Sequence, residues 1–212
     1  MINCNTVEIL SSLPDITIPR KAVLRRIGYP GDTKKLGKQI ETIFNELIKE
    51  TNKLINPAGS FIVFKINQNS GKRIIFDNSD FIINSPQVGK MLIDSDYVVV
   101  FIVTIGPELE EKVSVFLKNN EMTKAFIMDA MGSETADTVA DKLHYNLIAS
   151  KAASDSFKVT PRFSPGYGDW DIKVQSKIAD LCRSKIIGVK VNEYSMMIPK
   201  KSVSAVFGLQ HI

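Results

Sequence analysis

One segment gathers the side chains best suited to hold a small ligand, residues 161–171 with the sequence PRFSPGYGDWD. It contains two prolines, two glycines, three aromatic residues and one arginine. Glycines let a backbone approach a ligand closely and prolines stiffen it, so the pattern favours a rigid binding loop. The guanidinium of Arg162 could pair with a carboxylate or phosphate, and the rings could stack on an adenine or a cation. A surface turn without a ligand is the alternative that this composition leaves open.

A second group that could do chemistry lies on one predicted helix face. Asp137, Asp141 and His144 are spaced i, i+4 and i+7, so a helix places all three side chains on the same side. Carboxylates and an imidazole can ligate a metal, which leaves a metal-dependent hydrolase open, although the same spacing is common on solvated helix faces.

The sequence lacks the motifs of dinucleotide, nucleoside triphosphate and esterase sites, which are GxGxxG, GxxxxGK[ST] and GxSxG.

The composition is that of an ordinary globular protein. Its 212 residues are 44% hydrophobic and 24% charged, and the formal net charge of +4 gives no reason to expect nucleic acid as a partner. The longest apolar run, residues 97–105, is far shorter than the roughly 20 residues that span a bilayer as a helix. The N-terminus shows no secretory signal, and Cys4 and Cys182 form no metal or disulfide motif. We therefore expect a cytoplasmic protein without membrane contact.

The periodicity of apolar residues predicts an α+β fold. Helices are expected over residues 17–28, 35–55, 85–93, 107–117, 122–150 and 171–183. Strands are expected over residues 60–66, 72–76, 81–83, 97–105, 157–162, 188–191 and 202–209. The sequence has no internal repeat and no low-complexity linker, so we expect a single domain over residues 1–212. Its residues 1–58 would form a helical part, and residues 59–212 a central twisted, mainly antiparallel sheet flanked by helices.

The long helix predicted near 122–150 must position the acidic residues, and the loop that carries Arg162 follows shortly after it. The centre of this helix, residues 132–138, is unusually small and polar. Another backbone or a ligand could therefore pack closely there, and a solvent-facing helix middle is the alternative.

Three stretches in order resemble one known family. Residues 162–167, RFSPGY, match an Arg-x-x-x-Gly-Tyr signature; residues 136–144, ADTVADKLH, match an acidic helix ahead of it; and residues 192–204, which run from Asn-Glu-Tyr through a proline to Ser-Val-Ser, match a closing segment. Together they resemble the S-adenosylmethionine-binding activation domain of cobalamin-dependent methionine synthase. The overall form is most similar to the short, free-standing versions of this domain. The resemblance covers residues 120–209 well and the first hundred residues loosely.

The resemblance implies a binding site for S-adenosylmethionine. Arg162 matches the family's ligand-binding arginine, a natural partner for the carboxylate of the methionyl group. Ser164, Gly166 and Tyr167 match positions whose backbone lines the cofactor, and Asp137 aligns with a family glutamate that would face the ligand's ammonium or sulfonium. The family's N-terminal acidic contact and its C-terminal aromatic contact have no match here, which predicts a low affinity. No residue is expected to be a catalyst or a metal ligand.

The resemblance also implies a function in methionine biosynthesis. The protein would reactivate, in trans, a methionine synthase that lacks its own activation domain, by supporting reductive methylation of inactive cobalt(II) cobalamin. The partner would carry the cobalamin, because this chain has no Asp-x-His-x-x-Gly segment, and a flavodoxin or ferredoxin would donate the electron. The chain would thus be an accessory domain of a methyltransferase system rather than a complete enzyme. The alternative is a non-catalytic module that caps a corrinoid protein and has lost S-adenosylmethionine binding.

Overall fold

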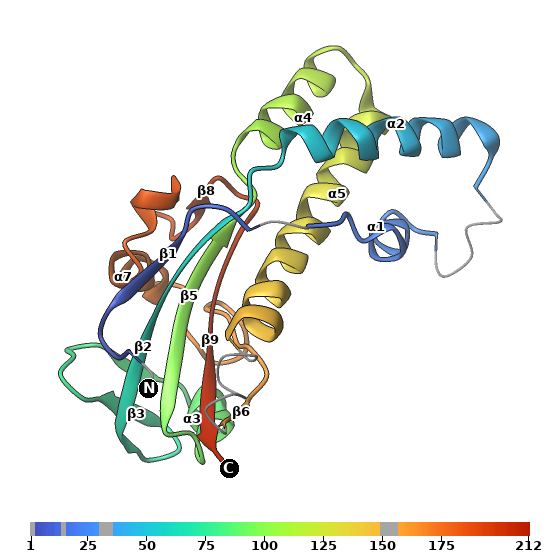
Figure 1. Ribbon diagram of the computed structural model, residues 1–212. Helices are drawn as coiled ribbons and strands as arrows, with labels where there is room; N and C mark the ends of the chain where they lie inside the picture. Colours follow the sequence, from blue (N-terminus) through green and yellow to red (C-terminus); the bar gives the residue numbers. More distant parts are fainter. Residues whose placement is uncertain (1–2, 14–15, 30–35, 149–156) are drawn as a thin grey trace.

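The computed structural model describes residues 3–13, 16–29, 36–148 and 157–212, and its centre is an antiparallel sheet (Figure 1). Seven strands form this sheet in the order β4-β3-β2-β5-β9-β6, with β1 pairing to β2 off this path. The strands are β1 Val7–Leu10, β2 Ala58–Asn69, β3 Arg73–Phe76, β4 Ile82–Asn84, β5 Tyr97–Thr104, β6 Phe157–Val159 and β9 Ser202–His211. A separate ribbon pairs β7, Lys190–Val191, with β8, Met197–Ile198.

Helices cover both faces of the sheet. The helices are α1 Arg20–Arg26, α2 Lys38–Leu54, α3 Pro86–Met91, α4 Glu108–Lys118, α5 Met122–Asp141 and α7 Val174–Leu181. A π-helical stretch, Lys142–Ile148, continues α5, and a 3-10 turn, Ser184–Ile187, follows α7. Helices α1, α2, α4 and α5 share one hydrophobic cluster with the sheet, and α3 and α7 share another on the opposite face (Figure 1).

The central strand β5 contributes to both of these clusters. Val99, Phe101 and Val103 pack toward α5 and its neighbours. The alternating residues Val98, Val100 and Ile102 pack toward α3 and α7. A strand buried on both faces needs apolar side chains at every position, because successive side chains point to opposite faces. This explains why residues 97–105 form an apolar run broken only by Thr104, and it confirms the buried strand predicted there.

The predicted fold class, an antiparallel sheet flanked by helices with one long helix, is confirmed. The long helix expected near 122–150 is α5 with its π-helical extension to residue 148, and residues 149 and 150 lie outside the described residues. The expected hairpin joins β2 to β3, with the Asn69 side chain accepting a hydrogen bond from the Gly71 amide at 2.8 Å.

The N-terminal part, for which the sequence predicts helices, also contains a strand, because residues 7–10 form β1. These four residues pair antiparallel with residues 59–62 of β2. A segment this short carries little signal of its own. The strand exists because β2 is 12 residues long and offers an edge that β3 covers only at its far end.

The small centre of α5 allows close packing. A Cβ atom at Gly132 would lie 2.6 Å from Leu109 Cδ2 of α4 and 3.3 Å from the Lys201 side chain. Glycine at this position therefore lets α4 and the segment before β9 approach α5. One turn further on, Ala136 lines a cleft, so the small residues serve both the packing and the cleft.

Candidate ligand-binding site

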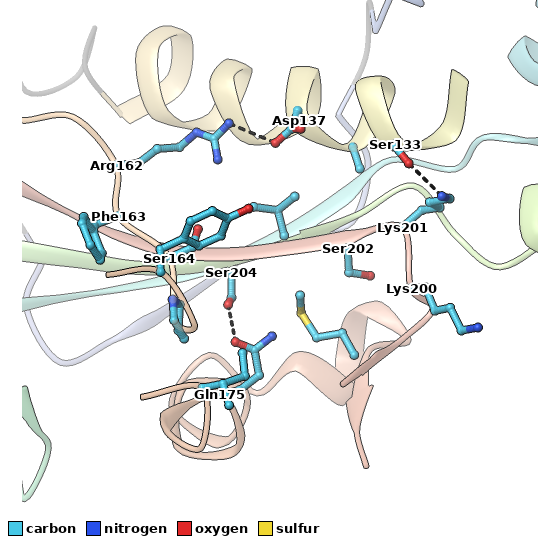
Figure 2. Close-up of a pocket in the computed structure, with 16 residues that line it drawn as sticks. Ser133, Asp137, Arg162, Phe163, Ser164, Gln175, Lys200, Lys201, Ser202 and Ser204 are labelled. Atoms are coloured by element: carbon cyan, nitrogen blue, oxygen red, sulfur yellow. Dashed lines mark hydrogen bonds and ion pairs between the residues drawn. The ribbon is translucent and has the colours of Figure 1, made fainter. Parts of the chain in front are cut away.

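A cleft of about 530 Å³ lies between four elements that are far apart in the sequence (Figure 2). Helix α5 supplies Ser133 and Asp137, and the loop of residues 161–171 supplies Arg162, Ser164 and Tyr167. Helix α7 contributes Gln175, β9 contributes residues 202–204, and the segment between β8 and β9 adds Lys200 and Lys201. The volume is in the range of pockets that hold small molecules and cofactors.

The cleft opens where the outer edge of β9 has no strand beside it. On this edge β6 pairs with β9 at residues 209–211, and the loop continues the pairing through a bridge between Phe163 and Val206. Among the described residues, no strand pairs with this edge at residues 202–204. The backbone of these residues therefore forms the floor of a recess between α5 and α7 (Figure 2).

Arg162 lies at one wall of the cleft and is held by two carboxylates of α5. Its Nη2 atom is 3.2 Å from Asp137 Oδ1, and its Nε atom is 3.0 Å from Asp141 Oδ1. The two aspartates are four residues apart, so α5 presents both to the same guanidinium. The arginine side chain is 23% exposed. These ion pairs hold the Arg162 guanidinium at the cleft, and the Asp137 carboxylate lies beside it in the lining.

The loop that carries Arg162 is anchored at its far end. The Gly166 amide donates to the Trp170 carbonyl at 2.8 Å, and the Trp170 side chain is buried. The Asp169 carboxylate accepts hydrogen bonds from the Ser85 hydroxyl and from the Gln87 amide at the start of α3. Gly168 lies against the end of the Gln87 side chain at φ +54°, a backbone conformation that glycine adopts without the steric cost of a Cβ. The prediction of a rigid loop agrees with these contacts.

Most of the site residues suggested by the sequence lie together in the cleft. Asp137, Arg162, Ser164 and Tyr167 all contribute to its lining. The Tyr167 side chain is 69% exposed. Gly166 is not part of the lining and lies on the outer surface of the loop at φ +85°, where a Cβ would meet Ile172. It shapes the turn that places its neighbours.

The three residues considered as a metal site do not converge. Asp137 and Asp141 both point to Arg162, whereas the His144 ring is buried against Phe207 with 4.4 Å between ring centroids. The Nε2 atom of His144 is 2.9 Å from the Thr160 carbonyl oxygen, and burial lowers the pKa of this imidazole. The described residues contain no group of three or more potential metal-binding side chains. The geometry gives no support to a metal-dependent hydrolase.

Sequence reasoning missed several polar residues of the cleft. Gln175 is only 4% exposed, and its Oε1 atom accepts a hydrogen bond of 2.7 Å from the Ser204 hydroxyl. Lys201 is anchored by Asp129 at 2.7 Å and by Ser133 at 2.8 Å. A signal for Gln175 was present, because it shares its helix face with the buried residues Ile178 and Cys182 at i+3 and i+7.

Comparison with models of known protein families gives a match for this chain. Residues 58–211 match the family model described as "Vitamin B12 dependent methionine synthase, activation domain". The chain belongs to this family. The resemblance drawn from the three motifs is thereby confirmed, and the family match extends further toward the N-terminus than the motifs do, through β2 to β5.

A solved structure of similar fold is described as "Crystal Structure of the MetH Reactivation Domain bound to AdoHcy". It superimposes with a TM-score of 0.71 at 17% sequence identity. The alignment covers 96% of this chain and 78% of that chain. No curated protein matches this sequence. Among the helices of the described residues, none combines the length and apolar content that crossing a membrane requires.

Proposed function

We propose that the cleft binds S-adenosylmethionine and that the protein supports the reductive reactivation of a cobalamin-dependent methionine synthase. The observation that carries the proposal is the convergence of Asp137, Arg162, Ser164 and Tyr167 in one cleft, although they come from a helix and a loop. Family membership supports the same function. The similar solved structure, which is described as bound to AdoHcy, agrees with this class of ligand.

The charges of the cleft suit the methionyl end of this ligand, which carries a carboxylate, an ammonium and a sulfonium. Arg162 offers a planar set of donors to the carboxylate, and Asp137 offers an acceptor to a cationic group beside it. Ser164 and its neighbours bring loop backbone to the opposite part of the ligand. The protein contributes position rather than a reacting side chain, by holding the methyl donor in one orientation.

The partner that we propose is a methionine synthase without an activation domain of its own, so that this chain acts in trans in the cytoplasm. The partner's cobalamin would supply the redox chemistry: it would accept one electron from a flavodoxin or ferredoxin and then the methyl group of the sulfonium, which would leave as S-adenosylhomocysteine. The chain's own residues bind and orient the methyl donor, and its exposed Tyr167 lies where the loop could meet the partner.

Calorimetry with S-adenosylmethionine tests the binding step. We expect Arg162→Ala to weaken binding by about tenfold or more, because a charge-assisted hydrogen bond is worth roughly 1.5–3 kcal/mol. Arg183→Ala is a matched control, since Arg183 is an arginine outside the cleft lining. If the wild type does not bind at millimolar ligand, the proposal of an S-adenosylmethionine site is wrong.

The alternative, a capping module without ligand binding, draws on one specific observation. Both ion pairs of Arg162 are made within the chain, so a ligand carboxylate must share or displace them. A reactivation assay with the partner enzyme, a chemical reductant and S-adenosylmethionine separates the two functions. Reactivation that is lost in Arg162→Ala supports the leading proposal. Equal reactivation by the variant and the wild type would favour the capping module.

A further inference from the structure

Gln175 is a buried polar side chain of the cleft with a hydrogen-bonding group that no described residue satisfies. It lies in the first turn of α7, is 4% exposed, and lines the cleft below the open edge of β9 (Figure 2). A buried amide that makes too few hydrogen bonds costs free energy, and most buried polar groups have partners. A glutamine in this position therefore calls for a partner on the cleft side.

The Ser204 hydroxyl fixes the orientation of this amide. It donates to Gln175 Oε1 at 2.7 Å, so the amide oxygen faces β9 and the amide nitrogen must face away from that bond. Among the described residues, Nε2 has no hydrogen-bond partner, and it is not among the side-chain atoms that are sealed from solvent without one. Its two N–H groups are thus available to the cleft.

We infer that Gln175 donates a hydrogen bond to the nucleoside end of the ligand and selects ligands that carry an acceptor there. The charged wall of Arg162 and Asp137 belongs to the α5 side of β9, whereas Gln175 rises from α7 on the other side (Figure 2). If the methionyl group lies at the charged wall, the nucleoside extends toward Gln175. Purine ring nitrogens such as N3 and N7 are acceptors, as are ribose hydroxyls. This inference rests on the proposed function.

The test compares two variants of Gln175 by calorimetry with S-adenosylmethionine and with S-adenosylhomocysteine. Gln175→Met keeps the shape and removes the donor, and Gln175→Glu replaces the donor by an acceptor. An acceptor left without its donor costs roughly 1–3 kcal/mol, so we expect both variants to bind about five- to a hundredfold more weakly. Gln175→Met should weaken both ligands by the same factor, since they share the nucleoside. Gln39→Glu, an exposed site on α2, is the matched control.

A double-mutant cycle tests whether Ser204 acts through Gln175. Ser204→Ala alone should weaken binding, because the amide is then free to rotate, whereas the same change in the Gln175→Met background should add nothing. Melting temperatures without ligand separate these effects from a loss of stability, which would change melting and leave the affinity of the folded protein as it is.

The outcomes separate the inference from the proposed function. A wild type that binds neither ligand overturns both. A wild type that binds, together with variants of Gln175 that bind equally well, overturns only the role of Gln175. If Gln175→Glu binds like the wild type while Gln175→Met binds weakly, the ligand uses the side-chain oxygen of residue 175 as an acceptor. The inferred role of the amide as a donor is then wrong. If the Gln175 variants lose affinity for S-adenosylmethionine but not for S-adenosylhomocysteine, Gln175 contacts the sulfonium rather than the nucleoside. This result would also overturn the inference.

Discussion

At the scale of single residues, Arg162 is one cation between two carboxylates, so the group carries one negative charge in excess. The two aspartates differ in position, because Asp137 lines the cleft and Asp141 lies outside its lining. Asp141 competes with a ligand carboxylate for the guanidinium, whereas Asp137 can also serve the ligand's cationic group. The cleft lining also carries Lys200 and Lys201, of which Lys201 is paired with Asp129, so this excess charge is local to the α5 wall, where it suits the ammonium or sulfonium of the ligand.

This difference predicts opposite effects for two conservative substitutions. Asp141→Asn should strengthen S-adenosylmethionine binding by up to about fivefold, since an exposed ion pair is worth roughly 0.2–1 kcal/mol. Asp137→Asn should weaken binding by a similar or larger factor, because the cationic group loses its acceptor. Calorimetry on both variants at one ionic strength measures this. Changes in the same direction would contradict the distinct roles.

The burial of His144 leads us to expect that the free energy of unfolding depends on pH. Burial is the main cause that lowers the pKa of its imidazole, so the unfolded chain binds a proton more readily than the folded chain does. The stability that this residue contributes is therefore present above a pH of about 6.5 and is lost as the pH falls below it, at no more than about 1.4 kcal/mol per pH unit. In His144→Gln, which can still donate to the Thr160 carbonyl, urea unfolding between pH 7 and 5 should show a flatter profile. An unchanged slope would contradict this role.

Part of the site could be predicted because its residues are close in the sequence. Arg162, Ser164 and Tyr167 belong to one loop, and the i, i+4 spacing of Asp137 and Asp141 indicated a shared helix face. Gln175 escaped prediction because its partner Ser204 lies 29 residues further on, and only the fold joins them. The metal alternative finds no support in the geometry for a related reason, since the sequence could not show that a cation from the loop pairs with both carboxylates.

At the scale of elements, the packing of α5 against α4 depends on Gly132. In an exposed helix, Gly→Ala stabilises by roughly 1 kcal/mol, but here the new Cβ would lie 2.6 Å from the buried Leu109 side chain. Overpacking costs about 1–3 kcal/mol, so we expect Gly132→Ala to lower the free energy of unfolding by about 1–2 kcal/mol in urea titrations. Gly37→Ala, at the N-cap of α2, is a control for the clash alone, because a Cβ there meets nothing within 4 Å but the position lies outside the helix interior. A gain in stability for Gly132→Ala would contradict the close packing.

The elements that could be predicted are those with a long periodic signal. The apolar stripe of α2 and the apolar run of β5 each indicate one structure strongly. The strands β1 and β8 were not predicted, and neither was the π-helical character of residues 142–148, which the sequence predicts as helix. Each is short, and β1 and β8 depend on pairing with another strand rather than on the preferences of their own residues.

At the scale of the whole molecule, the sheet is the framework that joins the two halves of the site. Strand β9 pairs with β5 along residues 97–104, so its position is set by the most deeply buried strand of the protein. Helix α5 packs on one face of this sheet and α7 on the other, and the cleft lies where both reach the edge of β9. Residues 133–137 and 175 thus keep their relative positions through a shared core.

The open edge of β9 has a consequence for association between molecules. A strand edge without a partner can template the addition of a strand from another chain, and this is a route to aggregation. At residues 202–204 the edge is recessed, with α5 on one side and α7 on the other, and residues 206–211 are already covered by the loop and β6. The walls that admit a small molecule therefore also shield the backbone from intermolecular sheet formation, so one recess gives the protein both a binding site and a protected edge.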